Sequence, residues 1–300
     1  MIRLDLISGF LGVGKTSFCN LLLRHYVKQG LRPVFIVNEF GKTGLDADII
    51  KADGFVVLEI EGGCICCTLK DDIGKAIISV VDKFSPTNIV FEPSGIFIFD
   101  NFFDIFKQQE ISKICEIGSV LTIVDGVNFS FSKTIYGSFI YNQIKNAETI
   151  LLSKLEKITH DAEEIICDIK NINPNAFIMH KVWEDLSDKD FELLLNQEKG
   201  LRIDHHAHHH SNLNTFTIKI DKPFSKDKLN SFIDECKSGA FGELCRVKGI
   251  VNVEGQNILL NIAMQDAVQE KFKGMSAQTL TFIGQTVKED EILSKIHSLA

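Results

Sequence analysis

Eight residues near the start of the chain have the types and spacing of a phosphate-binding loop, G-x-x-x-x-G-K-[ST]. Glycines let the backbone wrap phosphate oxygens with its N–H groups, and the helix that begins at the end of the loop adds positive potential. We expect Lys15 to reach the outer phosphates of a nucleotide and the Thr16 hydroxyl to bind Mg²⁺. The expected nucleotide-binding residues here are Gly9, Gly12, Val13, Gly14, Lys15, Thr16 and Ser17.

A carboxylate at the end of a later apolar segment has the chemistry to complete such a site. Residues 88–92 read as a short strand that ends in Glu92, and the chain then turns at Gly95. A phosphate-loop site needs an acid near Mg²⁺ at the end of a neighbouring strand, so we interpret Glu92 as catalytic together with Lys15 and Thr16. The Gly95 N–H is then expected near the γ-phosphate. The alternative is an ordinary acid at a strand end.

A third segment has the order of a guanine-reading loop, in which an Asn/Thr-Lys-x-Asp sequence follows a late strand. Here an apolar segment over residues 149–152 is followed by Ser153, Lys154 and Glu156. The Glu156 carboxylate is one methylene longer than that of Asp, so it offers the same acceptors to guanine from a shifted position. The alternative is a helix start in which Ser153 is the cap and Glu156 completes a capping box.

Three thiols lie within four residues, at Cys64, Cys66 and Cys67. Thiolates suit Zn²⁺ and other soft or borderline metals, and a zinc site takes about four ligands, so one position stays open for a carboxylate, a histidine or a partner protein. The candidate carboxylates are Glu39, Asp71 and Asp72. The alternatives are a redox pair of Cys64 with Cys67 and inert packing. Five isolated cysteines are expected in the core: Cys19, Cys115, Cys167, Cys236 and Cys245.

A second group of metal-binding side chains is a tract with five imidazoles. Such a tract is a multidentate ligand set for Zn²⁺, Ni²⁺ or Co²⁺, and we interpret it as metal capture or buffering. The alternative is a solvated linker with incidental histidines. The residues are His205, His206, His208, His209 and His210.

Composition narrows the class of protein. The chain has 300 residues, 45% hydrophobic and 24% charged, which is typical of a globular protein and excludes wholesale disorder. No apolar run approaches the roughly 18 residues of a membrane span. The net charge of −8 argues against a broad nucleic-acid surface. The early acid Asp5 is atypical of a secretory signal, so we expect a cytoplasmic protein, in which clustered cysteines indicate metal or redox chemistry.

The elements that must position these residues alternate before residue 200. A strand over residues 2–8 precedes a helix over residues 16–29 whose apolar residues recur near a 3.6 period. Short apolar segments predict further strands over residues 34–37, 55–60, 88–92, 119–124 and 149–152. Helices are expected over residues 69–84 and 161–171. This alternation predicts an α/β fold of the P-loop NTPase kind, with a mostly parallel sheet flanked by helices.

The pattern changes near residue 200. Strands are predicted over residues 215–220, 245–253 and 280–283, with a helix over residues 225–237 and a closing helix. We therefore expect a P-loop domain over residues 1–200, a His-rich linker over residues 201–212 and a small C-terminal α+β domain over residues 213–300.

Together these segments resemble the CobW-like family of P-loop GTPases, which act as metallochaperones or metal-insertion factors. The family's marks are a GxLGxGKT loop, an Asn-Glu-Phe-Gly segment, a Cys-x-Cys-Cys motif, an acid-x-x-Gly motif, a base-reading loop and a C-terminal domain after a histidine-rich linker. The matching segments of this chain are residues 9–16, 38–41, 64–67, 92–95, 153–156, the histidine tract, 246–249 and 282–285.

The resemblance implies a GTPase with slow intrinsic turnover that uses Mg²⁺, carries Zn²⁺, Co²⁺ or Ni²⁺, and delivers the metal to an unidentified client metalloprotein in a nucleotide-dependent way. It implies that Cys66 and Cys67 are the central thiolates and that Glu39 is a switch-region acid that ligates metal. A homo-oligomer is compatible with this function, and nucleic-acid or membrane partners are not expected. Two other functions stay open: an NTP-dependent small-molecule enzyme such as a kinase, and a zinc-storage or redox module.

Overall fold

The computed structural model describes residues 1–39, 50–51, 53–61, 69–99, 102–158, 162–197, 213–264, 266–272 and 278–299. The cysteines of the Cys-x-Cys-Cys motif and the five histidines of the tract lie outside these residues. The chain divides into two compact units, Met1–Ala207 and His208–Ala300, and each unit has its own sheet.

The first unit is built on a seven-stranded sheet in the order β3-β2-β4-β1-β5-β6-β7, in which every strand pair is parallel. The strands are β1 (Ile2–Gly9), β2 (Pro33–Glu39), β3 (Val57–Glu61), β4 (Asn88–Glu92), β5 (Cys115–Asp125), β6 (Thr149–Ser153) and β7 (Phe177–Met179). This confirms the predicted parallel sheet. Strand β7 was not predicted, because its three residues are too few to show a pattern.

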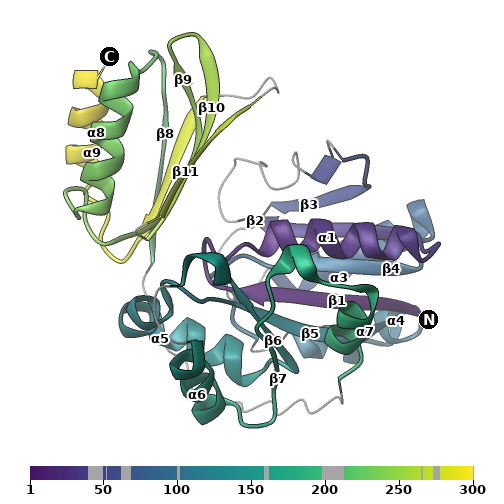
Figure 1. Cartoon of the computed structure of the whole chain (residues 1–300). Coiled ribbons are helices and arrows are strands. Elements are labelled where there is room, and N and C mark those ends of the chain that lie inside the picture. Colours follow the sequence, from purple (N-terminus) through teal and green to yellow (C-terminus); the bar gives the residue numbers. More distant parts are fainter. Residues whose placement is uncertain are drawn as a thin grey trace. The chain divides into compact units, whose positions relative to one another are not determined.

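Helices cover both faces of this sheet (Figure 1). They are α1 (Lys15–Lys28), α3 (Leu69–Phe84), α4 (Gln109–Ser112), α5 (Phe129–Lys145), α6 (Ala162–Ile172) and α7 (Asp188–Leu195). Phe18 of α1 stacks on Phe191 of α7 with a centroid distance of 6.1 Å, so these two helices share one face. Ile77 of α3 and Ile111 of α4 pack with Leu4 of β1 in a separate core cluster.

A buried carboxylate lies in the middle of β1. Asp5 is fully buried and accepts hydrogen bonds from the Tyr26 hydroxyl at 2.6 Å, the Arg3 Nε at 2.8 Å and the Ser119 N–H at 2.9 Å. Burial, and then the neighbouring Asp5 carboxylate, raises the pKa of Tyr26 well above its usual value. The network thus joins β1, α1 and β5 in the middle of β1, four residues before the strand ends at Gly9.

The second unit is a five-stranded antiparallel sheet in the order β11-β10-β9-β12-β8 (Figure 1). Its elements are β8 (Asn214–Lys219), α8 (Lys226–Lys237), β9 (Leu244–Val253), β10 (Gln256–Ala263), β11 (Asp266–Lys271), β12 (Thr279–Gly284) and α9 (Glu289–Leu299). Phe232 of α8, Ile292 of α9 and Phe282 of β12 share one core cluster, so both helices cover the same face of the sheet.

Strands β10 and β11 were missed by the sequence reading. The β9–β10 hairpin turns at Glu254 and Gly255, which both have positive φ (51° and 88°), as tight two-residue hairpin turns require. The usual sequence signal for such a turn is Asn-Gly or Asp-Gly, and Glu-Gly does not stand out.

One expectation about the core is wrong. Cys19, Cys115, Cys236 and Cys245 are buried as predicted, but Cys167 is exposed. On α6 the buried residues are Ile165 and Ile169, which are four positions apart and share one helix face. Cys167 lies midway between them in sequence, so the helical period turns its side chain outward. In the part of the chain that the structure describes, no helix is long and apolar enough to cross a membrane.

Candidate nucleotide-binding site

The phosphate loop connects β1 to α1, as predicted, and its glycines have backbone angles that favour glycine. The φ values are 145° at Gly9, 75° at Gly12 and 99° at Gly14. A Cβ added at Gly9 would stand 2.6 Å from the Ile123 carbonyl oxygen and 2.9 Å from the Val13 side chain. Glycine is therefore required at this position both by conformation and by space.

Lys15, the first residue of α1, is buried with its ammonium folded back over the loop. Its Nζ donates a hydrogen bond to the Phe10 carbonyl oxygen at 3.0 Å. This places a cation inside the ring of loop backbone, at the N-terminus of a helix, where phosphate oxygens are favoured. Ser17, two residues further along α1, is exposed.

Thr16 and Glu92 lie side by side, as the sequence predicted for a magnesium site. The Thr16 hydroxyl donates to Glu92 Oε1 at 3.1 Å, and Glu92 is buried at the end of β4, the strand next to β1. A hydroxyl and a carboxylate in contact provide the hard oxygen ligands that Mg²⁺ prefers. The residues present therefore fit the ion, which would be bound by Thr16 directly and by Glu92 from the adjacent strand.

The carboxyl ends of β2 and β3 lead toward the predicted metal ligands. Val37 lies opposite Glu92 in the β2–β4 pair, so Glu39 ends β2 two residues beyond that level. Glu39 in turn lies opposite Glu61, the last residue of β3. The sequence from Cys64 to Cys67 starts three residues after Glu61 and ends two residues before α3. The motif therefore follows, in sequence, a strand of the sheet that contains the phosphate loop, and its own residues lie outside the described part.

The expected base-reading loop follows β6, the second strand from β1 on the other side. Lys154 has a left-handed backbone (φ 58°), and its Nζ makes an ion pair with Asp125 Oδ2 at 2.7 Å. Ser153 donates its hydroxyl to the Val124 carbonyl oxygen at 3.3 Å, and Glu156 is exposed in the following short 3₁₀ turn, Leu155–Lys157. That turn has no side-chain cap, so the alternative of a Ser153–Glu156 capping box is wrong.

Asp125, at the end of β5, was not singled out from the sequence. Its Oδ1 accepts from the N–H groups of Val127 and Asn128 at 2.9 and 3.0 Å, and its Oδ2 accepts from the Asn128 side chain at 3.0 Å in addition to Lys154. The carboxylate therefore fixes both the turn after β5 and the lysine of the loop after β6. An acid at the end of a strand followed by a polar turn is a signal that could have found it.

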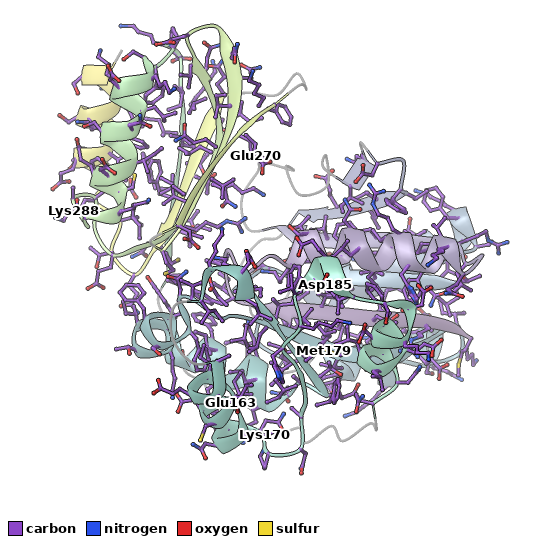
Figure 2. All side chains as sticks on the ribbon, in the orientation of Figure 1. Glu163, Lys170, Met179, Asp185, Glu270 and Lys288 are labelled. Carbon is purple, nitrogen blue, oxygen red and sulfur yellow. The ribbon has the colours of Figure 1, made fainter. Side chains whose placement is uncertain are left out.

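Trp183 is a second residue that the sequence reading missed. It opens the 3₁₀ turn Trp183–Asp185, shortly after Met179 ends β7; both Met179 and Asp185 are labelled in Figure 2. Its indole Nε1 donates to the Leu152 carbonyl oxygen at 3.0 Å. A Cβ added at Gly14 would lie 3.1 Å from the indole ring, so Trp183 joins the end of β6 to the phosphate loop.

Two models of known protein families match this chain. A family model described as "CobW/HypB/UreG, nucleotide-binding domain" matches residues 4–180, and one described as "Cobalamin synthesis protein cobW C-terminal domain" matches residues 213–300.

Individual relatives cover different shares of this chain. The zinc chaperone YjiA of Escherichia coli is 24% identical over an alignment of 318 positions, gaps included, that covers 97% of this chain and 96% of that protein. The zinc-regulated GTPase metalloprotein activator 1 of Dictyostelium discoideum is 24% identical, covering 83% of this chain and 62% of that protein. The zinc chaperone CobW of Sinorhizobium sp is 33% identical over an alignment of 131 positions that covers 41% of this chain and 36% of that protein.

Proposed function

Because this chain belongs to the CobW/HypB/UreG family, we propose that it is a GTP-hydrolysing metallochaperone that binds a transition metal at Cys64, Cys66 and Cys67 and delivers it to a client protein. The observation that carries the proposal is the contact of Thr16 with Glu92 at 3.1 Å, at the sheet edge from which β2 and β3 lead into Glu39 and the cysteine motif. A nucleotide at this edge and a metal on these thiolates would share neighbouring segments of chain.

Each part of the site has a separate role in binding the nucleotide. The loop backbone would bind the phosphates, Lys15 would neutralise charge on the outer ones, and Thr16 with Glu92 would hold Mg²⁺. Mg²⁺ held there would supply positive charge beside the phosphate oxygens. Lys154, held by Asp125, and Glu156 bind the guanine base from the loop after β6. Turnover is slow, because no arginine finger or water-positioning glutamine is evident in the sequence.

Metal and nucleotide are linked in this proposal through the segments that sense the γ-phosphate. γ-Phosphate and Mg²⁺ order such segments in P-loop GTPases, and hydrolysis releases them. Any change that GTP makes in metal affinity is matched by an equal change that the metal makes in GTP affinity. Thiolate binding requires loss of protons, so metal affinity rises with pH. Hydrolysis would then release the metal to its client.

Two of the relatives above are named zinc chaperones, so zinc is the favoured metal in this proposal. Thiolate, carboxylate and imidazole ligands also accept Co²⁺ and Ni²⁺, so the ligand types alone do not select among them. In this proposal the histidine tract buffers metal, and the C-terminal domain docks the client. A cytoplasmic location and a homo-oligomeric state stay parts of the same proposal.

A zinc titration tests the function directly. We expect protein loaded with a non-hydrolysable GTP analogue and protein loaded with GDP to differ in Zn²⁺ affinity by about fivefold or more, the lower end of measured allosteric coupling. Cys66→Ala should weaken Zn²⁺ binding, whereas the matched control Cys167→Ser, at an exposed cysteine of α6, should not. Equal affinities in both nucleotide states would exclude the coupling, and an unchanged affinity in Cys66→Ala would remove the motif from the site.

The two other functions give different results in simple assays. A small-molecule kinase without metal cargo would be stabilised against thermal unfolding by ATP and ADP rather than by GTP, since a ligand of the native state raises its stability by mass action. A zinc-storage or redox module would bind metal without hydrolysing any nucleotide, and Lys15→Ala would leave its metal affinity unchanged in every nucleotide state.

A further inference from the structure

The turn after β4 is pressed against the phosphate loop. A Cβ added at Gly95 would stand 2.6 Å from the Leu11 side chain and 2.7 Å from the Leu11 backbone nitrogen. No side chain fits there, so the backbone of Gly95 is in van der Waals contact with the backbone of the loop. This is the glycine whose N–H is expected near the γ-phosphate, a group that GTP has and GDP lacks.

A side chain from α5 holds the same turn from the other side. Gln143 is 1% exposed, and its Nε2 donates hydrogen bonds to the carbonyl oxygens of Gly95 and Phe97, both at 3.1 Å. Its neighbour Asn142 accepts a hydrogen bond from the Phe99 N–H at 3.0 Å through Oδ1. Three backbone groups of this turn are therefore fixed by two successive side chains of one helix.

The backbone of Gln143 is also connected to the start of the phosphate loop. Its carbonyl oxygen accepts a hydrogen bond from the Thr122 hydroxyl at 3.0 Å. The Thr122 and Ser8 hydroxyl oxygens are 2.7 Å apart, and because the Thr122 proton is used toward Gln143, Ser8 is the donor in that pair. Ser8 directly precedes Gly9. A continuous buried path of hydrogen bonds thus runs from the loop through β5 and α5 to Gly95.

We propose that Gln143 is a positioning residue that holds Gly95 against the phosphate loop and thereby sets the preference of the protein for GTP over GDP. The inference rests on the proposed GTP-dependent function and adds the residue that tunes it. With Gly95 already in place, its N–H does not have to be ordered when the γ-phosphate arrives, so binding of the triphosphate loses less free energy to ordering. GDP makes no contact with Gly95 and gains nothing from the arrangement.

A space-filling role does not account for the contacts. A buried primary amide is costly unless its donors are paired, and an aliphatic side chain of similar length would fill the same volume without that cost. The two N–H groups of Gln143 reach carbonyls that lie 48 and 46 residues away in the chain. A contact of this kind restricts one particular backbone segment, the one that follows the catalytic Glu92.

The test compares Gln143→Met, which keeps length and removes both donors, with a matched control whose side-chain amide binds the C-terminal end of the same helix from outside it. Asn173 also uses a side-chain amide to bind carbonyl oxygens of α5 and its end, those of Ile144, Lys145 and Ala147 at 2.9, 3.2 and 2.9 Å, far in sequence from Gly95. The measured quantity is the ratio of Kd for GDP to Kd for a non-hydrolysable GTP analogue. Thermal unfolding of each protein without ligand is measured alongside.

We expect Gln143→Met to weaken binding of the GTP analogue about tenfold and GDP by less than about twofold, as two lost hydrogen bonds allow. Asn173→Leu should lower the unfolding temperature and leave the ratio unchanged. Gln143→Asn, whose shorter amide cannot reach both carbonyls, should shift the ratio in the same direction and serves if the methionine variant does not fold.

Two results would overturn the inference: an unchanged ratio in the Gln143 variants, or an equal shift of the ratio in Asn173→Leu. Zn²⁺ titration of the wild-type protein in both nucleotide states separates a failure of the role of Gln143 from a failure of the proposed function. If the wild-type protein binds GTP analogue and GDP but shows no difference in Zn²⁺ affinity between them, the metallochaperone coupling fails, while the role of Gln143 is still decided by the ratio.

Discussion

At the scale of single residues, the site depends on a cation that the loop holds in place before any ligand arrives. Lys15 is buried and bonded to Phe10, at the N-terminus of α1. Such a preorganised donor stabilises charge that develops on phosphate during transfer, and removal of one donor of this kind typically lowers kcat by about 100-fold or more.

Lys15→Ala should therefore lower GTP hydrolysis about 100-fold or more with little change in unfolding temperature. Lys28→Ala is the matched control, because Lys28 ends the same helix, is exposed and forms a surface ion pair with Asp188, which contributes little to stability. The measurement is phosphate release under saturating GTP. Hydrolysis at the wild-type rate in Lys15→Ala would contradict the assignment of the loop.

Several of the residues that sequence alone identified have local reasons. Gly9 and Gly14 are set by the backbone angles of one short loop, and Lys15 by the helix that follows. Gln143 and Trp183 could not be found in this way, because their partners Gly95 and Leu152 lie 48 and 31 residues away. The assignments of Glu39, the cysteine motif and the histidine tract stay predictions.

At the scale of elements, α1 has a glycine with positive φ just before its start and another just after its end, and the two differ in their surroundings. Gly14 has φ of +99°, and the ring of Trp183 lies 3.1 Å from where a Cβ would stand. Gly30, just beyond the end of α1, has φ of +76° with nothing within 4 Å of that position. Both glycines thus have a left-handed backbone that disfavours other residues, but an added Cβ would meet a neighbouring side chain at Gly14 and open space at Gly30.

Gly30→Ala should cost about 1–2 kcal/mol of unfolding free energy and leave nucleotide affinity unchanged, because a left-handed backbone with a Cβ is its main penalty. Gly14→Ala should cost a similar amount and also weaken GDP binding about tenfold, because its methyl group displaces Trp183 and the loop together. Chemical unfolding measures the loss of stability in both variants, and titration with GDP measures their nucleotide affinity. Equal GDP affinities would show that the Trp183 contact is unimportant for binding.

The contact between β1 and α1 gives the protein a specific alkaline response. The raised pKa of Tyr26 means that the folded state keeps the phenol protonated where the unfolded chain, with an ordinary value near 10, ionises. This contribution to stability is complete below about pH 10 and is lost as the pH rises through the folded-state pKa. Asp5 accepts the hydrogen bond of the hydroxyl, and Arg3 pairs with the same carboxylate.

Tyr26→Phe should be less stable than wild type by about 1–3 kcal/mol at neutral pH, because the Asp5 carboxylate loses a donor. The difference should shrink above about pH 10, since only the wild-type protein has a phenol to ionise. Denaturant unfolding of wild type and Tyr26→Phe at neutral and alkaline pH measures the difference in stability and its change with pH. A constant difference across this range would contradict the role assigned to the hydroxyl.

Strand prediction succeeded where apolar segments were flanked by clear turns and failed elsewhere. Strands β1, β4 and β6 stand out as short apolar runs before Gly, Glu and Ser. Strand β7 is too short to show a period, and β10 follows a Glu-Gly turn that resembles ordinary surface sequence. The order of strands in both sheets depends on pairings between distant segments, which no local pattern reveals.

At the scale of the whole molecule, the chain consists of two units with separate cores. The family, the fold class and the class of enzyme, a P-loop GTPase, were predicted correctly from the combination of motifs. The boundaries at residues 200 and 212 stay predictions. In the second unit Phe232 is fully buried and packs with Phe282 at a centroid distance of 6.2 Å.

The C-terminal unit should fold on its own, because its core draws only on its own helices and sheet. A protein limited to residues 208–300 is expected to unfold in one cooperative thermal transition. Phe232→Ala in that protein should lower its stability by about 3–5 kcal/mol, as for other fully buried phenylalanines. A gradual, non-cooperative loss of structure in the unsubstituted fragment would show that the unit depends on the first one.

The chain has one tryptophan, and its indole lies against Gly14 with its N–H on the Leu152 carbonyl. All indole fluorescence of this protein therefore originates beside the phosphate loop, at the end of the strand that leads into the base-reading segment. The intensity and wavelength of this fluorescence should therefore change when a ligand binds beside Trp183 at the phosphate loop. Under the proposed function, exchange of diphosphate for triphosphate is expected to change this fluorescence, which can be followed in the unmodified protein without any attached dye.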